Sequence, residues 1–128
     1  MSTADTLSED ISSIIARLND DFRMAATGAA LGQVDPRGVP GRFVITAAVN
    51  QLPADEQIDL ITKLRLFNRF NYANDPHGEH NFGIIEYKDE TYNWRIDYYD
   101  KSLQYGSEDP SDPEQTTRVM TLMHRFDA

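Results

Sequence analysis

Cysteine is absent from this sequence of 128 residues. The chain therefore has no disulfide framework, no thiol nucleophile and no thiolate metal site. It also lacks an apolar run close to the ~20 residues that span a bilayer. The N-terminal stretch from Met1 to Asp10 carries neither the basic region nor the apolar segment of a secretory signal. These absences predict a cytoplasmic protein without a membrane partner.

Basic residues are also scarce. The chain has 12 lysines and arginines against 21 aspartates and glutamates, which gives a net charge of −9. Residues 1–70 hold nine acids and seven bases, a net of −2, whereas residues 71–128 hold twelve acids and five bases, a net of −7. An acidic surface repels nucleic acid and attracts basic proteins or cations. We therefore expect no direct contact with nucleic acid, and a basic protein as the partner of the C-terminal half.

The length fits a single domain over residues 1–128, with a core that needs no disulfide or structural metal. Apolar residues at helical spacing predict a first helix over residues 7–25, which follows a capping-box pattern at Thr6-Leu7-Ser8-Glu9. Residues 1–5 are expected to be frayed. The expected core positions of this helix are Ile14, Ile15, Leu18 and Phe22.

The middle of the chain, residues 26–69, is predicted to form a loop, a strand and a helix in turn. Residues 26–41 contain four of the seven glycines, which predicts a flexible loop. β-forming residues then predict a strand over residues 42–49. Pro53 begins a second predicted helix over residues 53–69, because proline suits a first helical turn. The expected buried face of that helix consists of Ile58, Ile61, Leu64 and Phe67, with Leu60 and Phe70 at its margin.

Strict alternation from Tyr92 to Tyr98 predicts a strand whose Trp94 face is buried. Residues 82–87 and 91–98 should form an antiparallel hairpin, which a short strand over 102–105 extends into a meander. Pro113, after Asp112 as N-cap, predicts a last helix over 113–125. The predicted fold class is α+β, an antiparallel sheet of three or four strands covered on one face by about three helices.

The region from Asn74 to Asp100 holds two of the three histidines, the only tryptophan and four of the six tyrosines. Within it, Asp75-Pro76-His77-Gly78 has the sequence of a type I turn. Neutral imidazoles and carboxylates bind metal ions or transfer protons, so this region holds a candidate catalytic cluster. The cluster consists of His77, Glu79, His80, Asp97 and Asp100.

Structural roles compete with catalysis at each of these positions. His80 could hydrogen-bond to nearby backbone, and Asp97 could pair with Arg95 on the same face of its strand. Neither the histidine spacing nor Asn81 matches a recognised ligand set, so we expect no bound metal and no cofactor. An interaction surface is the other candidate site, because exposed tyrosine and acidic side chains suit a protein contact. Its residues are Tyr99, Asp100, Glu108, Asp109 and Glu114.

Four separated motifs, taken together, resemble one family. They are Asn74-Asp75-Pro76-x-Gly78-Glu79-His80-x-Phe82-Gly83, Trp94-x-Ile96-Asp97-Tyr98-Tyr99-Asp100, Gly106-Ser107-x-Asp109-Pro110-x-Asp112-Pro113 and Thr117-Arg118-Val119-Met120-Thr121. The family comprises small bacterial proteins, frequent in alphaproteobacteria and their mobile elements, and is described only as a domain of unknown function. The resemblance begins at Leu18-Asn19-Asp20, and Asn81 stands where the family commonly has aspartate.

Three hypotheses about function follow. The preferred one is a small acidic interaction module, from a mobile element or phage, that binds a basic nucleic-acid-binding protein and acts as a counter-defence inhibitor. The alternative is a small metal-dependent hydrolase that uses the histidine and carboxylate cluster. The third is a purely structural or assembly role. The preferred hypothesis requires no enzymatic activity, and no oligomeric state follows from any of the three.

Overall fold

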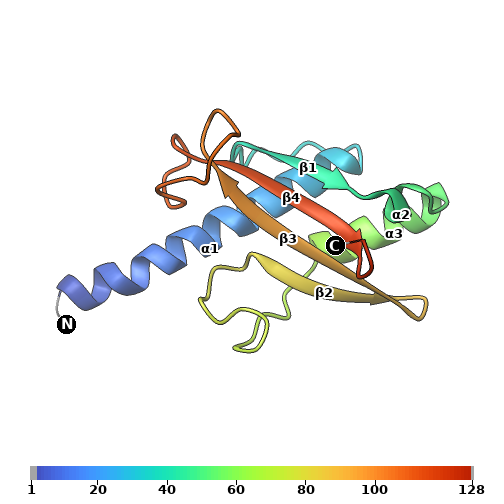
Figure 1. Cartoon of the computed structure of the whole chain (residues 1–128), viewed down its shortest axis with the longest axis horizontal. Helices are drawn as coiled ribbons and strands as arrows, with labels where there is room; N and C mark the ends of the chain where they lie inside the picture. The colour runs from blue at the N-terminus through green and yellow to red at the C-terminus, as the bar shows by residue number, and fades with distance from the viewer. Residues whose placement is uncertain (1–2, 128) are drawn as a thin grey trace.

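The computed structural model describes residues 3–127, with side chains from Ile11 onward. It contains a four-stranded sheet with helices on one face (Figure 1). The strands lie in the order β1-β4-β3-β2, and β1 is parallel to β4 while the other pairs are antiparallel. In chain order the elements are α1 (Thr3–Ala30), β1 (Gly41–Ile45), α2 (Ala47–Asn50), α3 (Ala54–Arg65), β2 (Phe82–Tyr87), β3 (Glu90–Tyr99) and β4 (Thr117–His124).

This arrangement confirms the predicted α+β class, although the sheet is mixed rather than wholly antiparallel. The predicted hairpin is also confirmed, since β2 and β3 pair antiparallel and Trp94 has no exposed surface. Trp94 belongs to a core that β3 and β4 share with α1 and α3, which lie behind the sheet in Figure 1. The helices contribute Phe22, Leu60 and Leu64 to this core.

The predicted helix over residues 113–125 is wrong, because residues 117–124 form β4. Val119, Leu122 and Met123 have helical spacing, but short apolar runs do not distinguish a helix from a buried strand. β4 lies in the interior of the sheet and pairs with β1 on one side and β3 on the other. The backbone N–H and C=O groups on both sides of β4 therefore form hydrogen bonds with strands that are distant in sequence.

Several other boundaries differ from the prediction. The strand over 102–105 is wrong, because that segment consists of turns and bends. The strand over 42–49 ends at Ile45, where the chain enters α2. α3 ends at Arg65, four residues before the predicted end, and the chain turns so that Phe67 and Phe70 pack edge-on against Trp94. Ile58 is 53% exposed whereas Leu60 is fully buried, which reverses their predicted roles.

α1 is longer than predicted at both ends. It continues to Ala30, so the glycine- and proline-containing loop begins at Leu31 rather than at residue 26. Its backbone begins at Thr3, and the capping-box side chains from Thr6 to Glu9 lie outside the described residues, as do residues 1–2 of the expected frayed end. Within residues 3–127, no helix combines the length and the apolar character needed to cross a membrane.

Candidate functional site

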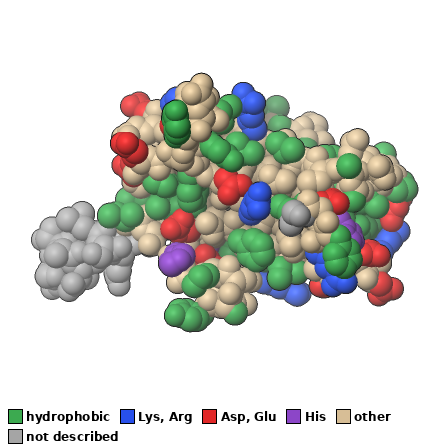
Figure 2. All heavy atoms as spheres, viewed as in Figure 1, with side chains coloured by type: hydrophobic (Ala, Val, Ile, Leu, Met, Phe, Trp, Pro, Cys, Tyr) green, Lys and Arg blue, Asp and Glu red, His purple; other side chains and the backbone are tan. Residues whose placement is uncertain are grey.

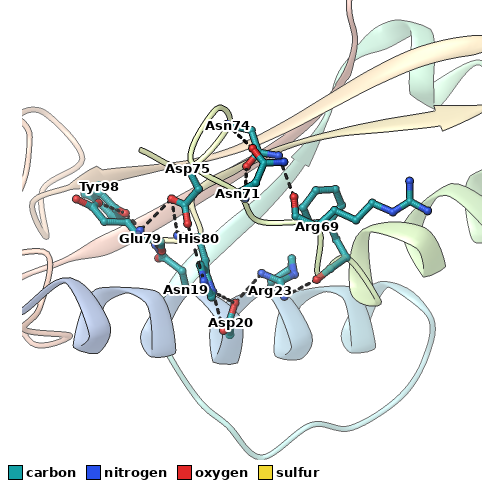
Figure 3. A network of polar contacts seen from close by, with 11 residues as sticks. Asn19, Asp20, Arg23, Arg69, Asn71, Asn74, Asp75, Glu79, His80 and Tyr98 are labelled. Carbon is teal, nitrogen blue, oxygen red and sulfur yellow. Dashed lines mark hydrogen bonds and ion pairs between the residues drawn. The ribbon is translucent and has the colours of Figure 1, made fainter. Parts of the chain in front are cut away.

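The turn at Asp75 positions the two candidate residues that follow it. The Gly78 N–H donates to the Asp75 carbonyl at 3.1 Å, as predicted for this turn. The Asp75 carboxylate then accepts the backbone N–H groups of Glu79 and His80 at 2.9 and 3.1 Å. These bonds hold His80 at a φ of 57°, a left-handed conformation that is uncommon outside glycine. The turn consequently directs Glu79 and His80 toward α1 (Figure 3).

His80 is held between two carboxylates (Figure 3). Its Nδ1 lies 3.0 Å from an oxygen of Asp20 on α1, and its Nε2 lies 3.8 Å from Asp75 Oδ2. Its ring stacks on Phe70, with the ring centroids 4.0 Å apart and an angle of 2° between the planes. Asp20 also accepts a hydrogen bond from Arg23 at 3.0 Å. The imidazole therefore joins α1 to the turn through its polar atoms and packs on the core through its face.

Glu79 belongs to a second branch of the same network, which Asn19 organises. The Tyr98 hydroxyl donates to Glu79 at 2.7 Å. Asn19 is fully buried, and its Nδ2 donates to the Tyr98 oxygen at 2.8 Å and to the Glu79 carbonyl at 2.9 Å. The Asn19 Oδ1 accepts from Arg118 Nε at 2.7 Å. One amide side chain thus connects α1, β3, β4 and the turn.

Two buried arginines flank this network. Arg23 donates to the Phe67 carbonyl at 3.2 Å, and its guanidinium carbon lies 5.3 Å from the centre of the Trp94 ring. Burial lowers the pKa of Arg23, and the charge of Asp20 opposes that shift. Arg118 lies 5.2 Å from the Tyr98 ring centre, and burial also lowers the pKa of Arg118. Both guanidiniums retain one buried nitrogen without a hydrogen-bond partner among the described residues.

The structure separates the predicted catalytic cluster. Glu79 and His80 share the network, whereas His77 is exposed in the turn. Asp97 pairs with Arg95 at 3.1 Å, the structural role anticipated for it. Asp100 closes the turn after β3 by accepting from the Ser102 hydroxyl at 2.7 Å. Among the side chains that the structure describes, from Ile11 onward, no three His, Asp or Glu are arranged to hold one metal ion. The hydrolase hypothesis therefore finds only two of its five residues in one place.

Sequence reasoning missed the α1 side of the network. Asn19, Arg23 and Thr27 follow Ile15 at intervals of four residues, and all four are buried. A polar series on the inward stripe of a helix is the signal that could have revealed them. Asp20, which follows Asn19 on α1, contacts both His80 and Arg23. No comparable signal marks the partners that these residues find elsewhere in the chain.

Burial, followed by the hydrogen bond to Glu79, raises the pKa of Tyr98 above its ordinary value. The folded state therefore favours the neutral phenol, and this stabilisation is complete below the ordinary tyrosine pKa of about 10. It is lost as the pH rises through the raised folded-state pKa. We expect the free energy of unfolding to fall more steeply above about pH 10 in the wild type than in Tyr98→Phe. Urea titrations of both proteins between pH 8 and pH 11 measure the two slopes; equal slopes would contradict this role.

The predicted interaction residues lie mainly in the loop between β3 and β4. Asp100, Glu108 and Glu114 line a hollow of about 420 Å³, together with the 71% exposed Tyr105. The Ser102 hydrogen bond helps to lower the pKa of Asp100, so its carboxyl group is ionised at neutral pH. Acidic side chains gather at the upper left of Figure 2, where Figure 1 places this loop. The hollow thus combines three carboxylates with an exposed aromatic ring.

The other two predicted interaction residues lie apart from the hollow. The Asp109 carboxylate is used inside the loop, where it accepts from the backbone N–H of Ser111 at 3.1 Å. Tyr99 is partly buried at the end of β3, opposite Thr117 of β4. Tyr98 packs against the core, as predicted for the Trp94 face of its strand. The interaction role of the whole set stays a prediction.

Comparison with known proteins gives one match. The family described as "Protein of unknown function (DUF3768)" matches residues 45–127, which include β2, β3, β4 and the turn at Asp75. No curated protein and no solved structure matches the chain. The match confirms the resemblance to a domain of unknown function over this range, and the wider resemblance from Leu18 stays a prediction. With well over half of its length matched, the chain belongs to the DUF3768 family.

Proposed function

We propose that this protein is an interaction module that binds a basic protein through the hollow lined by Asp100, Glu108 and Glu114. The observation that carries the proposal is the convergence of these three carboxylates beside an exposed tyrosine. A guanidinium or ammonium group would meet opposite charge there and the face of an aromatic ring. The fourth charge in the hollow, Lys101, is directed elsewhere, since its Nζ donates to the Pro113 carbonyl at 2.9 Å.

The carboxylates of Glu108 and Glu114 are free to engage such a group. Neither accepts a hydrogen bond from any other residue in the described part of the chain, in contrast to Asp109. Their contribution should be to association rate and specificity, because charges at an interface rim steer the encounter. The excess of acid in residues 71–128 strengthens this steering.

We also propose that the partner is a nucleic-acid-binding protein encountered in the cytoplasm. A basic surface that binds nucleic acid would fit the acidic hollow, and its occupation would block nucleic-acid binding. Inhibition of a host defence or regulatory protein by a mobile element is one form of this function. The negative charge of residues 71–128 and the acidic hollow support this proposal. The same two features would suit any partner protein with exposed arginines.

The binding test uses a glycine-rich peptide that contains two arginines, with the citrulline version as an uncharged control. We expect the arginine peptide to shift the backbone NMR signals of residues 100–116, and added salt to weaken the binding. Glu108→Lys/Glu114→Lys should raise the dissociation constant about tenfold or more. The matched control is Asp55→Lys/Asp89→Lys, which makes the same charge change at exposed positions elsewhere. Equal losses in both double variants, or equal binding of the citrulline peptide, would refute the proposed site.

A further inference from the structure

β2 is an edge strand with one row of unpaired backbone groups. The Ile96 N–H donates to the Asn81 carbonyl at 2.8 Å, so these opposed residues form a hydrogen-bonded pair. Hydrogen-bonded and non-bonded pairs alternate along antiparallel strands. The register of β2 with β3 therefore directs the N–H and C=O groups of Ile84 and Glu86 away from β3. In Figure 1 this edge forms the lower margin of the sheet.

A groove of about 770 Å³ lies along this edge, between β2 and the C-terminal end of α3. Its apolar surface includes Phe67 and two exposed side chains, Leu66 and Ile84. Leu66 is 68% exposed and Ile84 is 48% exposed, so the groove presents apolar surface beside an open strand. A strand that paired with β2 would cover both side chains.

Positive charge predominates on the helix side of the groove. Lys63 and Arg69 line it, and neither forms an ion pair with another described residue. Asp59, the acid on the same side, accepts from the Tyr87 hydroxyl at 2.9 Å, and its charge offsets one of the two cations. Glu86 accepts from the Thr91 hydroxyl at 2.9 Å and lies on the opposite face of β2, since it alternates with the buried Ile85 and Tyr87. Figure 3 shows the Arg69 side chain extending away from the polar network. In a chain with a net charge of −9, the helix side of the groove therefore carries two cations against one carboxylate, an excess of positive charge.

We propose that this groove binds an extended segment of a partner protein in which acidic and apolar residues alternate, and that the segment adds a fifth strand to the sheet at β2. Strand addition satisfies the open backbone groups of Ile84 and Glu86 and uses alternate side chains for specificity. The side chains on the helix side of the new strand meet Lys63 and Arg69, which select acids. Those on the opposite side meet Ile84, which selects apolar residues.

Charge favours such a segment over a second copy of this chain. Two copies paired edge to edge would bring two sets of Lys63 and Arg69 to one interface, and like charges oppose association. The groove shares no lining residue with the acidic hollow, so it is a separate surface with the opposite preference for charge. The inference is independent of the function proposed for the hollow.

The test uses a capped peptide of alternating valine and glutamate, equal in length to the 6 residues of β2, and the full chain. We expect the peptide to shift the NMR signals of residues 63–69 and 82–87 and to leave those of 100–116 unchanged. A peptide of alternating valine and lysine should not bind. Lys63→Glu/Arg69→Glu should raise the dissociation constant about tenfold or more, since it reverses both cations. The matched control is Arg17→Glu/Arg42→Glu, the same charge change at two exposed positions.

The binding of N-methylated peptides tests separately whether the peptide pairs with the backbone of β2. Only every second N–H of an added strand faces β2, so N-methylation of one alternate set of peptide residues should abolish binding while methylation of the other set should preserve it. Equal effects of the two methylated peptides would overturn strand addition. The proposal is also overturned if the peptide leaves residues 82–87 unshifted. Analytical sedimentation of the free chain tests a second copy as the occupant. If the wild type sediments as a dimer and Lys63→Glu/Arg69→Glu as a monomer, the β2 edge binds a second copy and the proposal is overturned.

Discussion

Gly83→Ala is expected to destabilise the protein by about 3 kcal/mol or more, at the upper end of the usual cost of overpacking. A Cβ at Gly83 would lie 2.3 Å from Trp94 Nε1 and 2.5 Å from Phe67 Cζ. Trp94 has no exposed surface and Phe67 is also buried, so neither ring has room to move. Alanine is intrinsically better than glycine within a strand by roughly 0.5–1 kcal/mol, so a measured loss reports the clash.

The matched control for this variant is Gly106→Ala. A Cβ at Gly106 would have Tyr98 O as its nearest neighbour, at an ordinary contact distance of 3.9 Å. We expect its free energy of unfolding in urea to stay within about 0.5 kcal/mol of the wild type. If Gly83→Ala were as stable as Gly106→Ala, the tight packing of β2 over Trp94 would be incorrect.

Asn19→Ala is expected to cost about 3 kcal/mol, because it leaves several buried groups without partners. Arg118 Nε loses its acceptor, and the Tyr98 hydroxyl and the Glu79 carbonyl each lose a donor. The largest share should come from Arg118, whose charge is buried and whose Nη1 already lacks a partner among residues 3–127. Arg17→Ala, on the exposed face of the same helix, should change stability by less than about 0.5 kcal/mol.

A double-mutant cycle separates the network from a general effect on α1. If the cost arises through Arg118, Asn19→Ala should cost less in an Arg118→Met background, in which the buried cation is already absent. The free energy of unfolding from urea titrations gives the coupling directly. Full additivity of the two substitutions would mean that the bond between Asn19 Oδ1 and Arg118 Nε contributes nothing to stability.

Local patterns predicted the parts of the fold that depend on neighbours in sequence. The period-2 alternation of β3 and the short connection to β2 determined the hairpin and the burial of Trp94. Helical spacing located most of α1, and the turn at Asp75 followed from its own four residues. In each case the residues that determine the local structure lie within a few positions of it in the sequence.

The candidate site could be predicted only in part for the same reason. The sequence pattern identifies Glu79 and His80 as candidates together with Asp97 and Asp100, but these two aspartates have local partners of their own. The partners of Glu79 and His80 on α1 are distant in sequence: Asp20 is 60 residues from His80, and Asn19 is 60 residues from Glu79. Nothing in the sequence near His80 specifies that pairing.

The sequence by itself determined the acidity of the C-terminal half, the turn, the hairpin and the existence of α1. Only the tertiary structure decided that residues 117–124 form a strand, because β1 and β3 supply the hydrogen bonds that a helix would otherwise provide within itself. It also decided which polar residues on α1 are buried and which two strands form the edges of the sheet. Both depend on contacts between distant segments, and local propensity carries no information about such contacts.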